Sequence, residues 1–250
     1  MESTVRFGER AADYARFRPS YPIALVEALL AGFTQPDVAD LGAGTGISAA
    51  LLAACGARVV AVEPNAAMRA AIAPHANVAT VAATAEATSL ADASVDVVTA
   101  FQAYHWFDAD AVLREAARIA RPRARFAAVW NERDLGDAFT AAYQRIIDRY
   151  ILDDTERARI AREGTIDGDL CRHGWTSVRS IAVRHDRSLD WDTLVGVARS
   201  SSYLPKSGPA YAAMERELRA LYDAAAPGAA RFALIATAHI GERGETTLVE

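Results

Sequence analysis

Hydrophobic positions along the chain change period repeatedly, and these changes predict alternating strands and helices. Short apolar runs bounded by glycine, proline and polar residues are typical of buried strands, whereas apolar residues at every third or fourth position indicate amphipathic helices. The apolar runs predict strands directly after Pro36 and at residues 57–63, 78–82, 94–102, 125–130, 177–185 and 231–240. The helical pattern predicts helices at residues 22–32, 47–56, 66–73, 110–120, 136–162, 191–198 and 210–224. This alternation favours an α/β fold with a parallel sheet.

Two of the predicted helices have patterns that also bear on packing. In the first, which proline opens, we expect the buried stripe to comprise Ile23, Leu25, Val26, Leu29 and Leu30. The helix within residues 136–162 carries a stripe of large side chains, which we interpret as core rather than as a binding surface. Its members are Phe139, Tyr143, Ile146, Ile147 and Tyr150.

The end of the first predicted strand carries three glycines at alternating positions. Asp40, Gly42, Gly44 and Gly46 form the pattern D-x-G-x-G-x-G, and a helical stretch begins at Ile47. Glycines let the backbone turn tightly at the carboxyl end of a strand and approach a bound ligand closely. Dinucleotide-binding loops place their third glycine one residue later, where this chain has Ile47. The motif therefore argues against NAD or FAD and favours a nucleoside without a pyrophosphate.

An acidic residue ends the second predicted strand. Glu63 follows Gly42 by 21 residues, so it is expected beside the glycine loop. A carboxylate there can accept hydrogen bonds from both hydroxyls of a ribose. The alternative is a surface glutamate at a strand end, but the glycine loop ahead of it favours the ribose-binding role.

These motifs, together with others in the expected order, resemble the class I S-adenosylmethionine-dependent methyltransferases. The resemblance rests on VADLGAGTG (38–46), VVAVEP (59–64), ATAE (83–86) and VDVVTAFQ (95–102). It extends over nearly the whole chain through YARFRPSYP (14–22), QAYHWF (102–107) and WNERD (130–134). Together these segments look like the small-molecule branch that contains trans-aconitate methyltransferase-like proteins.

The resemblance implies a Rossmann-like α/β fold. Its seven-stranded, mostly parallel sheet has helices on both faces and a helical lid, and the last strand runs antiparallel between the fifth and the sixth. We expect a single methyltransferase domain over residues 1–250. Its parts would be an N-terminal cofactor-covering segment with the first helix (1–36), the cofactor-binding core (37–135), a C-terminal strand with the helical lid (136–230) and the last strand with a tail (231–250).

The resemblance also implies S-adenosyl-L-methionine as the cofactor and S-adenosyl-L-homocysteine as its product. Tyr14 and Arg18 are predicted at the methionine carboxylate, although Arg18 could equally be solvated and Tyr14 could cap the core edge. Thr84, Ala85 and Glu86 are predicted at the adenine, with the amide of Ala85 the better supported contact because many relatives have an acid in place of Thr84. The other predicted cofactor residues are Asp40, Gly42, Ala43, Gly44, Gly46, Glu63, Pro64 and Gln102.

The stretch after the fourth predicted strand bears on the methyl acceptor. Residues 102–108 lack the Asn/Asp-Pro-Pro-aromatic run with which relatives hold an exocyclic amine, so methylation of DNA, RNA bases or protein glutamine is disfavoured. Histidine titrates near neutral pH, which makes His105 a candidate base or substrate-orienting residue. Alternatively, His105 and Trp106 only form a wall of the pocket.

Three later residues complete the predicted substrate site. Arg133 either holds a substrate carboxylate bidentately or pairs with Glu132 or Asp134 within the loop. Asn131 is delivered to the same edge, and Tyr203 lies either in the pocket or in an ordinary turn between helices. The predicted reaction is methyl transfer to a carboxylate or hydroxyl of a small organic acceptor, with His105 and Arg133 as catalytic candidates. A carboxylate needs no base, whereas a hydroxyl would use His105.

Composition excludes several other classes of protein. A net charge of −5 gives no electrostatic reason to expect a nucleic acid or an anionic membrane as partner. Two cysteines do not make a disulfide framework, and no metal is expected, because Cys171 and His173 are interpreted as part of a loop rather than as a metal pair. Without a signal core or a membrane-length apolar run, we expect a cytoplasmic monomer or homodimer whose partner is the small-molecule acceptor.

Two rival interpretations remain at this point. A nicotinamide-dependent oxidoreductase could use a related sheet, although Ile47 in the glycine motif opposes it. A protein that binds the same cofactor without transferring its methyl group, or that catalyses a rearrangement of a bound ligand, would carry the same motifs.

Overall fold

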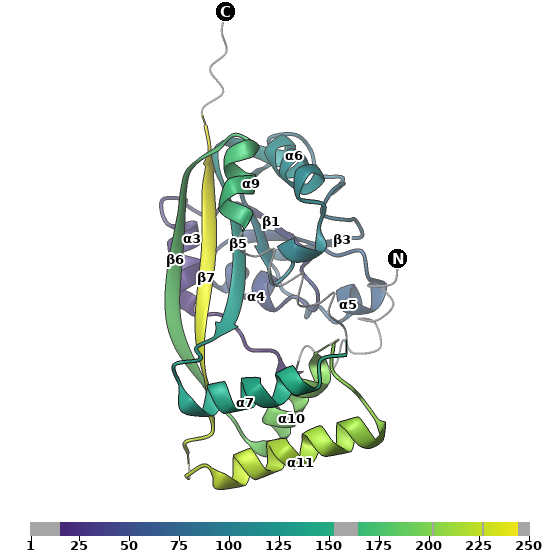
Figure 1. The fold of residues 1–250 in the computed structure, drawn as a ribbon. Helices are drawn as coiled ribbons and strands as arrows, with labels where there is room; N and C mark the ends of the chain where they lie inside the picture. The colour runs from purple at the N-terminus through teal and green to yellow at the C-terminus, as the bar shows by residue number, and fades with distance from the viewer. Residues whose placement is uncertain (1–15, 153–164, 202, 227, 245–250) are drawn as a thin grey trace, which may run out of the picture.

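The described chain forms one seven-stranded sheet in the order β3-β2-β1-β4-β5-β7-β6 (Figure 1). The computed structural model describes residues 16–152, 165–201, 203–226 and 228–244. Neighbouring strands are parallel from β3 to β5, and β7 pairs antiparallel with both β5 and β6. The predicted topology is thereby confirmed, including the last strand between the fifth and the sixth. The strands are β1 (Asp37–Leu41), β2 (Arg58–Val62), β3 (Val78–Val81), β4 (Val95–Phe101), β5 (Ala120–Arg133), β6 (Trp175–Ser188) and β7 (Arg231–Arg243).

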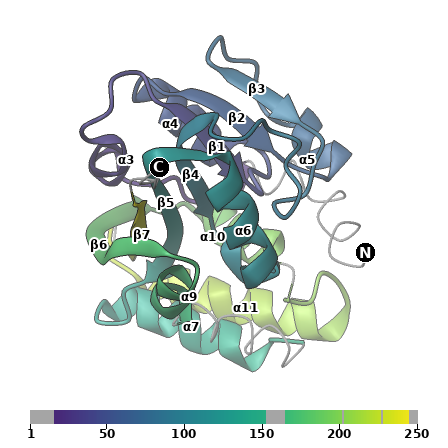
Figure 2. The same ribbon diagram turned by 90° about the horizontal axis from the view of Figure 1, so that it is seen from above.

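Helices cover both faces of this sheet. Figure 2 shows α3 (Ile23–Leu30) and α4 (Ile47–Ala54) on one face, and α6 (Ala109–Ile119) and α9 (Ile166–Arg172) on the other. Each face has its own hydrophobic cluster, because the buried strands present apolar side chains in both directions. The short helix α5 (Ala66–Ala70) follows β2, and the 3-10 helix η1 (Tyr104–Trp106) follows β4.

Side-chain caps fix the starts of several helices. The Asn65 side chain accepts hydrogen bonds from the Ala67 and Met68 amides at the start of α5. Asp108, Asp137 and Asp190 cap α6, α7 (Ala138–Arg149) and α10 (Trp191–Ser200) in the same manner. Each cap satisfies an amide that has no partner within its helix, so these short polar residues determine where the helices begin.

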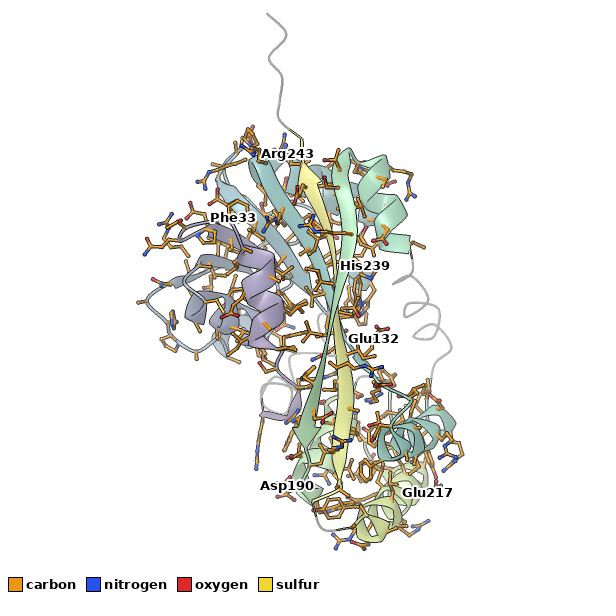
Figure 3. All side chains as sticks on the ribbon, turned by 90° about the vertical axis from the view of Figure 1, so that its left-hand side faces the viewer. Phe33, Glu132, Asp190, Glu217, His239 and Arg243 are labelled. Carbon is orange, nitrogen blue, oxygen red and sulfur yellow. The ribbon has the colours of Figure 1, made fainter. Side chains whose placement is uncertain are left out.

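A third hydrophobic cluster joins α7, α10 and α11 (Gly208–Ala224) into a lid at the carboxyl ends of the parallel strands (Figure 1). Phe232 and Leu234 of β7 belong to this cluster, together with Tyr143 of α7 and Leu218 of α11. Strands β6 and β7 are long enough to run from the body of the sheet into the lid. Figure 3 shows this span from Arg243 at one end, past His239, to Asp190 at the other.

The structure corrects several predicted boundaries. Ile23 is 57% exposed and lies outside the buried stripe of α3, whereas the other four predicted members are buried. Strand β5 begins five residues before the predicted residue 125, because Ala120 already pairs with Val95 of β4, ahead of a register shift that precedes the pairing of Arg125 with Val97. The predicted helix at residues 136–162 ends as α7 at Arg149, and residues 153–164 lie outside the described chain.

The segment around Cys171 is helical, which the sequence interpretation as a loop missed. Helix α9 buries Ile166 and Leu170 against the core, and Cys171 is exposed. His173 Nε2 lies 2.8 Å from Asp110 Oδ1. Among the described residues, no group of three or more metal-binding side chains comes together. Within the same residues, no helix combines the length and apolar character that a membrane span requires.

A buried carboxyl lies beneath the glycine loop. Asp40, which is fully buried, accepts hydrogen bonds from Ser48 Oγ at 2.6 Å and from Thr99 Oγ1 at 2.8 Å. Burial raises the pKa of Asp40 to about 6, because desolvation opposes the charged form more strongly than the two hydroxyl donors favour it. The side chain therefore links β1, β4 and the first turn of α4 underneath the loop.

Replacement of Asp40 by asparagine is expected to change how stability depends on pH. The folded wild type binds a proton at Asp40 below about pH 6, whereas the unfolded chain binds it only below about pH 3.8, so the free energy of unfolding gains from this group as the pH falls. A difference of about 2 pKa units corresponds to on the order of 3 kcal/mol. In urea unfolding, the free energy of unfolding of the wild type should rise relative to that of Asp40→Asn as the pH is lowered from 7 to 4. A stability difference that does not vary with pH would contradict this account.

Candidate functional site

A cavity of about 740 Å³ lies between the carboxyl ends of the strands and the lid. The loop after β1, the ends of β4 and β5, and residues of α7, α10 and β7 all contribute to its lining. Glu132 lines this cavity. Figure 3 shows it between the body of the sheet and the lid, whose helix α11 carries Glu217. Ligand sites of α/β folds occupy this edge of the sheet.

The three glycines of the loop differ in what surrounds them. A Cβ added to Gly42 would lie 2.9 Å from Ala103 Cβ, and one added to Gly46 would lie 2.9 Å from Ile72 Cγ2. Both glycines also have positive φ angles, +66° and +83° respectively, so packing and backbone conformation each require glycine there. Gly44 has φ +56°, lines the cavity and has no atom within 4 Å of an added Cβ. Gly44 therefore presents bare backbone to the cavity.

Glu63 holds the glycine loop against β2. One oxygen of its carboxylate accepts a hydrogen bond from the Gly44 amide at 2.9 Å, and the other accepts one from the Asn65 amide at 2.8 Å. The amides of Gly42 and Ala43 donate to Val62 O at 2.9 and 3.2 Å. Glu63 is 7% exposed and lies next to the cavity-lining loop rather than in the lining itself. Its predicted contact with a ribose stays a prediction.

Two hydroxyl residues that were not singled out in the sequence line the cavity, Thr45 in the glycine loop and Ser48 in the first turn of α4. Thr45 is 6% exposed, and its Oγ1 has no hydrogen-bond partner among the described residues. Ser48 donates its hydroxyl to Asp40. Asp40 lies beneath the loop and is not among the residues that line the cavity. The available sequence signal for the two hydroxyl residues was their position, with Thr45 between two motif glycines and Ser48 two residues after the last one.

The predicted adenine-binding turn lies apart from the cavity lining. Thr84 and Ala87 form an isolated antiparallel bridge, Ala85 is buried, and Glu86 Oε1 accepts a hydrogen bond from the Asp108 amide at 3.2 Å. Thr84, Ala85, Glu86 and Pro64 are absent from the residues that line the cavity. Of the two residues predicted at the methionine carboxylate, Arg18 lines the cavity and Tyr14 lies outside the described residues.

The wall formed by η1 and the end of β5 brings together aromatic residues from two elements. His105, Trp106 and Trp130 line the cavity, and Trp130 Nε1 donates a hydrogen bond to His105 Nδ1 at 3.3 Å. Tyr104 anchors η1 from behind by donating its hydroxyl to Asp169 Oδ2 at 3.0 Å. Burial, supported by the adjacent Asp169 carboxylate, raises the pKa of Tyr104, so the hydroxyl keeps the proton that this bond needs.

Arg133 lies in the cavity at the end of β5. Its guanidinium packs over the rings of Tyr143 and Phe232, 4.8 and 5.7 Å from their centroids, and Nη1 donates to Gln144 Oε1 at 2.6 Å. Asp134, one of the loop partners considered for Arg133, lies 3.5 Å from Arg184 instead. Aromatic packing of this kind holds a guanidinium in place without neutralising its charge.

Tyr203, Asn131 and Gln102 also line the cavity. Burial pushes the pKa of Tyr203 upward, but the guanidinium groups of Arg133 and Arg18 outweigh burial and lower it. The Asn131 side chain donates to Ser20 O at 3.0 Å and lies 2.7 Å from His185 Nε2. Gln102 Nε2 donates to Asn131 O at 2.9 Å. Asn131 and Gln102 therefore tie the cavity wall together.

Comparison with known proteins matches residues 39–128 to the methyltransferase domain family. An uncharacterized methyltransferase of Mycobacterium tuberculosis is 40% identical over 137 residues, which cover 53% of this chain and 55% of that protein. The match thus spans about half of the relative's length.

Solved structures show the same fold over a larger share of the chain. A putative type II methyltransferase from Anaeromyxobacter dehalogenans has a TM-score of 0.68 and 27% identity, covering 92% of this chain and 98% of that one. Phosphoethanolamine N-methyltransferase 2 of Haemonchus contortus, solved with S-adenosyl-L-methionine, has a TM-score of 0.58 and 12% identity, covering 97% of this chain and 57% of that one. Residues 39–128 thus match the methyltransferase domain family, within a chain that shares the fold of solved methyltransferases.

Proposed function

We propose that the protein transfers a methyl group from S-adenosyl-L-methionine to a carboxylate or hydroxyl of a small organic acceptor. The observation that carries the proposal is the asymmetry of the glycine loop. Gly42 and Gly44 both line the cavity of about 740 Å³, but an added Cβ would meet packed atoms at Gly42 and at Gly46, whereas it would meet none within 4 Å at Gly44. A volume of this size suits a nucleoside cofactor together with a small second ligand.

The residues of the loop fit the cofactor chemically. The cofactor's polar groups need donors and acceptors once they leave water, and Thr45 Oγ1 is a buried hydroxyl with no partner among the described residues. The bare backbone at Gly44 permits close approach, and Glu63 lies directly beside it. When bound, S-adenosyl-L-methionine supplies a methyl group already activated by its sulfonium. The protein then has only to orient the acceptor and exclude water.

The lid side of the cavity supports an acidic acceptor. Arg133 is held by aromatic rings and by Gln144, which leaves a guanidinium suited to a carboxylate. Val197, Phe232 and Leu234 provide apolar lining around it. The resemblance to trans-aconitate methyltransferase-like proteins also favours a small acid. A hydroxyl acceptor is the second possibility, because Tyr203, whose pKa is lowered by the two neighbouring arginines despite its burial, lines the same space.

The cofactor site is tested by the substitution Gly44→Ala, which adds a Cβ atom at a glycine that lines the cavity. In Gly44→Ala and in the matched control Gly56→Ala, alanine replaces a glycine of positive φ (+56° and +92°) with no atom within 4 Å of the new Cβ. Each substitution is expected to destabilise the fold by roughly 1–2 kcal/mol through backbone strain. Of these two glycines, Gly44 lines the cavity and Gly56 does not. Gly44→Ala alone should therefore weaken S-adenosyl-L-methionine binding, by about tenfold or more in calorimetry. Equal affinities in the two variants would contradict the assigned site.

The acceptor site is tested with labelled S-adenosyl-L-methionine and a panel of small carboxylic acids and phenols. We expect label to move to an acid, and Arg133→Gln to raise the KM for that acid by about 10- to 100-fold because a charged hydrogen bond is lost. Arg184→Gln is the matched control, since the Arg184 side chain is 79% exposed and pairs with Asp134 outside the cavity. An unchanged KM would exclude Arg133 from acceptor binding. Cofactor binding without any label transfer would favour the non-methylating alternative.

A further inference from the structure

The hydrogen bond between Trp130 and His105 determines which nitrogen of the histidine carries hydrogen. Indole has one N–H donor and no acceptor, whereas a neutral imidazole has one nitrogen of each kind. Trp130 Nε1 lies 3.3 Å from His105 Nδ1 and donates to it. His105 Nδ1 must therefore be the accepting nitrogen, and the hydrogen of the neutral ring belongs on Nε2.

Both partners of this hydrogen bond are held by their surroundings. Trp130 is 2% exposed and packs edge-on against Tyr104 and His239, with ring centroids 6.3 and 5.8 Å apart. His105 follows Tyr104 in η1, which the hydroxyl of Tyr104 anchors to Asp169, and its ring lies 5.4 Å from that of Trp106. The opposite tautomer would place an Nδ1–H against the indole N–H, so two donors would face each other in a partly buried position.

We propose that Trp130 is a positioning residue that holds His105 as the Nε2–H tautomer, so that His105 binds the methyl acceptor as a hydrogen-bond donor and does not remove a proton from it. The role toward the acceptor rests on the proposed methyl transfer, whereas the tautomer itself does not. A base would have to present a lone pair at Nε2, and the Trp130 bond places the hydrogen there. His105 lines the cavity, so this donor belongs to the wall beside Trp106.

A hydrogen-bond donor at His105 limits the chemical class of acceptor that the site can use. A donor at His105 stabilises an oxygen that already carries negative charge, as in a carboxylate. A neutral hydroxyl would have to lose its proton to another group. Other groups that line the cavity include Tyr203, which is adjacent to Arg133 and Arg18, and Asp148, which accepts a hydrogen bond from Gln144. Glu132 also lines it, and its carboxylate accepts a hydrogen bond from Thr237 Oγ1 at 3.5 Å.

The tautomer can be measured without substrate. Long-range proton–nitrogen correlation spectra of the ¹⁵N-labelled full chain distinguish a protonated Nε2 from a protonated Nδ1, and the signals missing in His105→Gln identify the residue. At a pH where the His105 ring is neutral, we expect hydrogen on its Nε2 in the wild type and a mixture of tautomers in Trp130→Phe. A wild-type signal from Nδ1–H would overturn the proposal whether or not Trp130→Phe folds.

The role toward the acceptor is measured by comparing two replacements of His105. Glutamine keeps an N–H donor near the position of Nε2 but cannot act as a base near neutral pH, whereas leucine provides neither function. With the acid identified in the labelling assay, we expect kcat/KM to fall less than about tenfold in His105→Gln and about 10- to 100-fold in His105→Leu. Equal large losses in both variants would overturn the donor role. If no acid is methylated, the proposed function fails, while the spectra still decide the tautomer.

Discussion

The cavity depends on a glycine loop that two carboxyl groups hold from different sides. Glu63 binds the amides of Gly44 and Asn65 beside the loop, and Asp40 binds Ser48 and Thr99 beneath it. Glycines in left-handed conformations lose more freedom on folding than other residues, so such a loop needs strong local bonds to keep one shape. Hydrogen bonds to carboxylates are stronger than those between neutral groups, which suits them to this task. The motif thus combines a tight glycine turn with carboxyl groups that hold the turn in one conformation.

Much of the fold could be predicted because local patterns and long-range packing agree. The apolar runs marked every strand, and capping residues such as Asn65 and Asp108 stand where the helices begin. The misses occur where distant contacts decide the outcome. Strand β5 continues back through Pro122 and Arg123, which interrupt its apolar run, because Ala120 pairs with Val95 of β4. Helix α9 is short and contains Gly168, and it forms where Ile166 and Leu170 join the core cluster of Trp175.

The site was predictable to a similar degree and for the same reason. The glycine loop, His105, Trp106, Arg133 and Tyr203 were expected at one edge of the sheet and all line the cavity. The partner of His105 was not found, because Trp130 is 25 residues away on another element and its hydrogen bond leaves no local pattern. The sequence suggests the adjacent carboxylates as partners of Arg133, whereas its observed neighbours are residues of α7 and β7. The turn at Thr84–Glu86 matches a family motif but is not among the residues that line the cavity, so its contact with an adenine stays a prediction.

The central position of β7 has a consequence for how the molecule comes apart. This strand is hydrogen-bonded on both edges, to β5 and to β6, and its first residues contribute Phe232 and Leu234 to the core of the lid. The helices above the cavity are therefore not a separate module on a hinge, since removing them would strip apolar cover from strands that also complete the sheet. We expect the described lid and sheet to melt together, as one calorimetric transition. Substitutions in α10, whose Val197 lines the cavity, can then change the shape of its lid side while the shared strand β7 keeps the sheet and the lid in place.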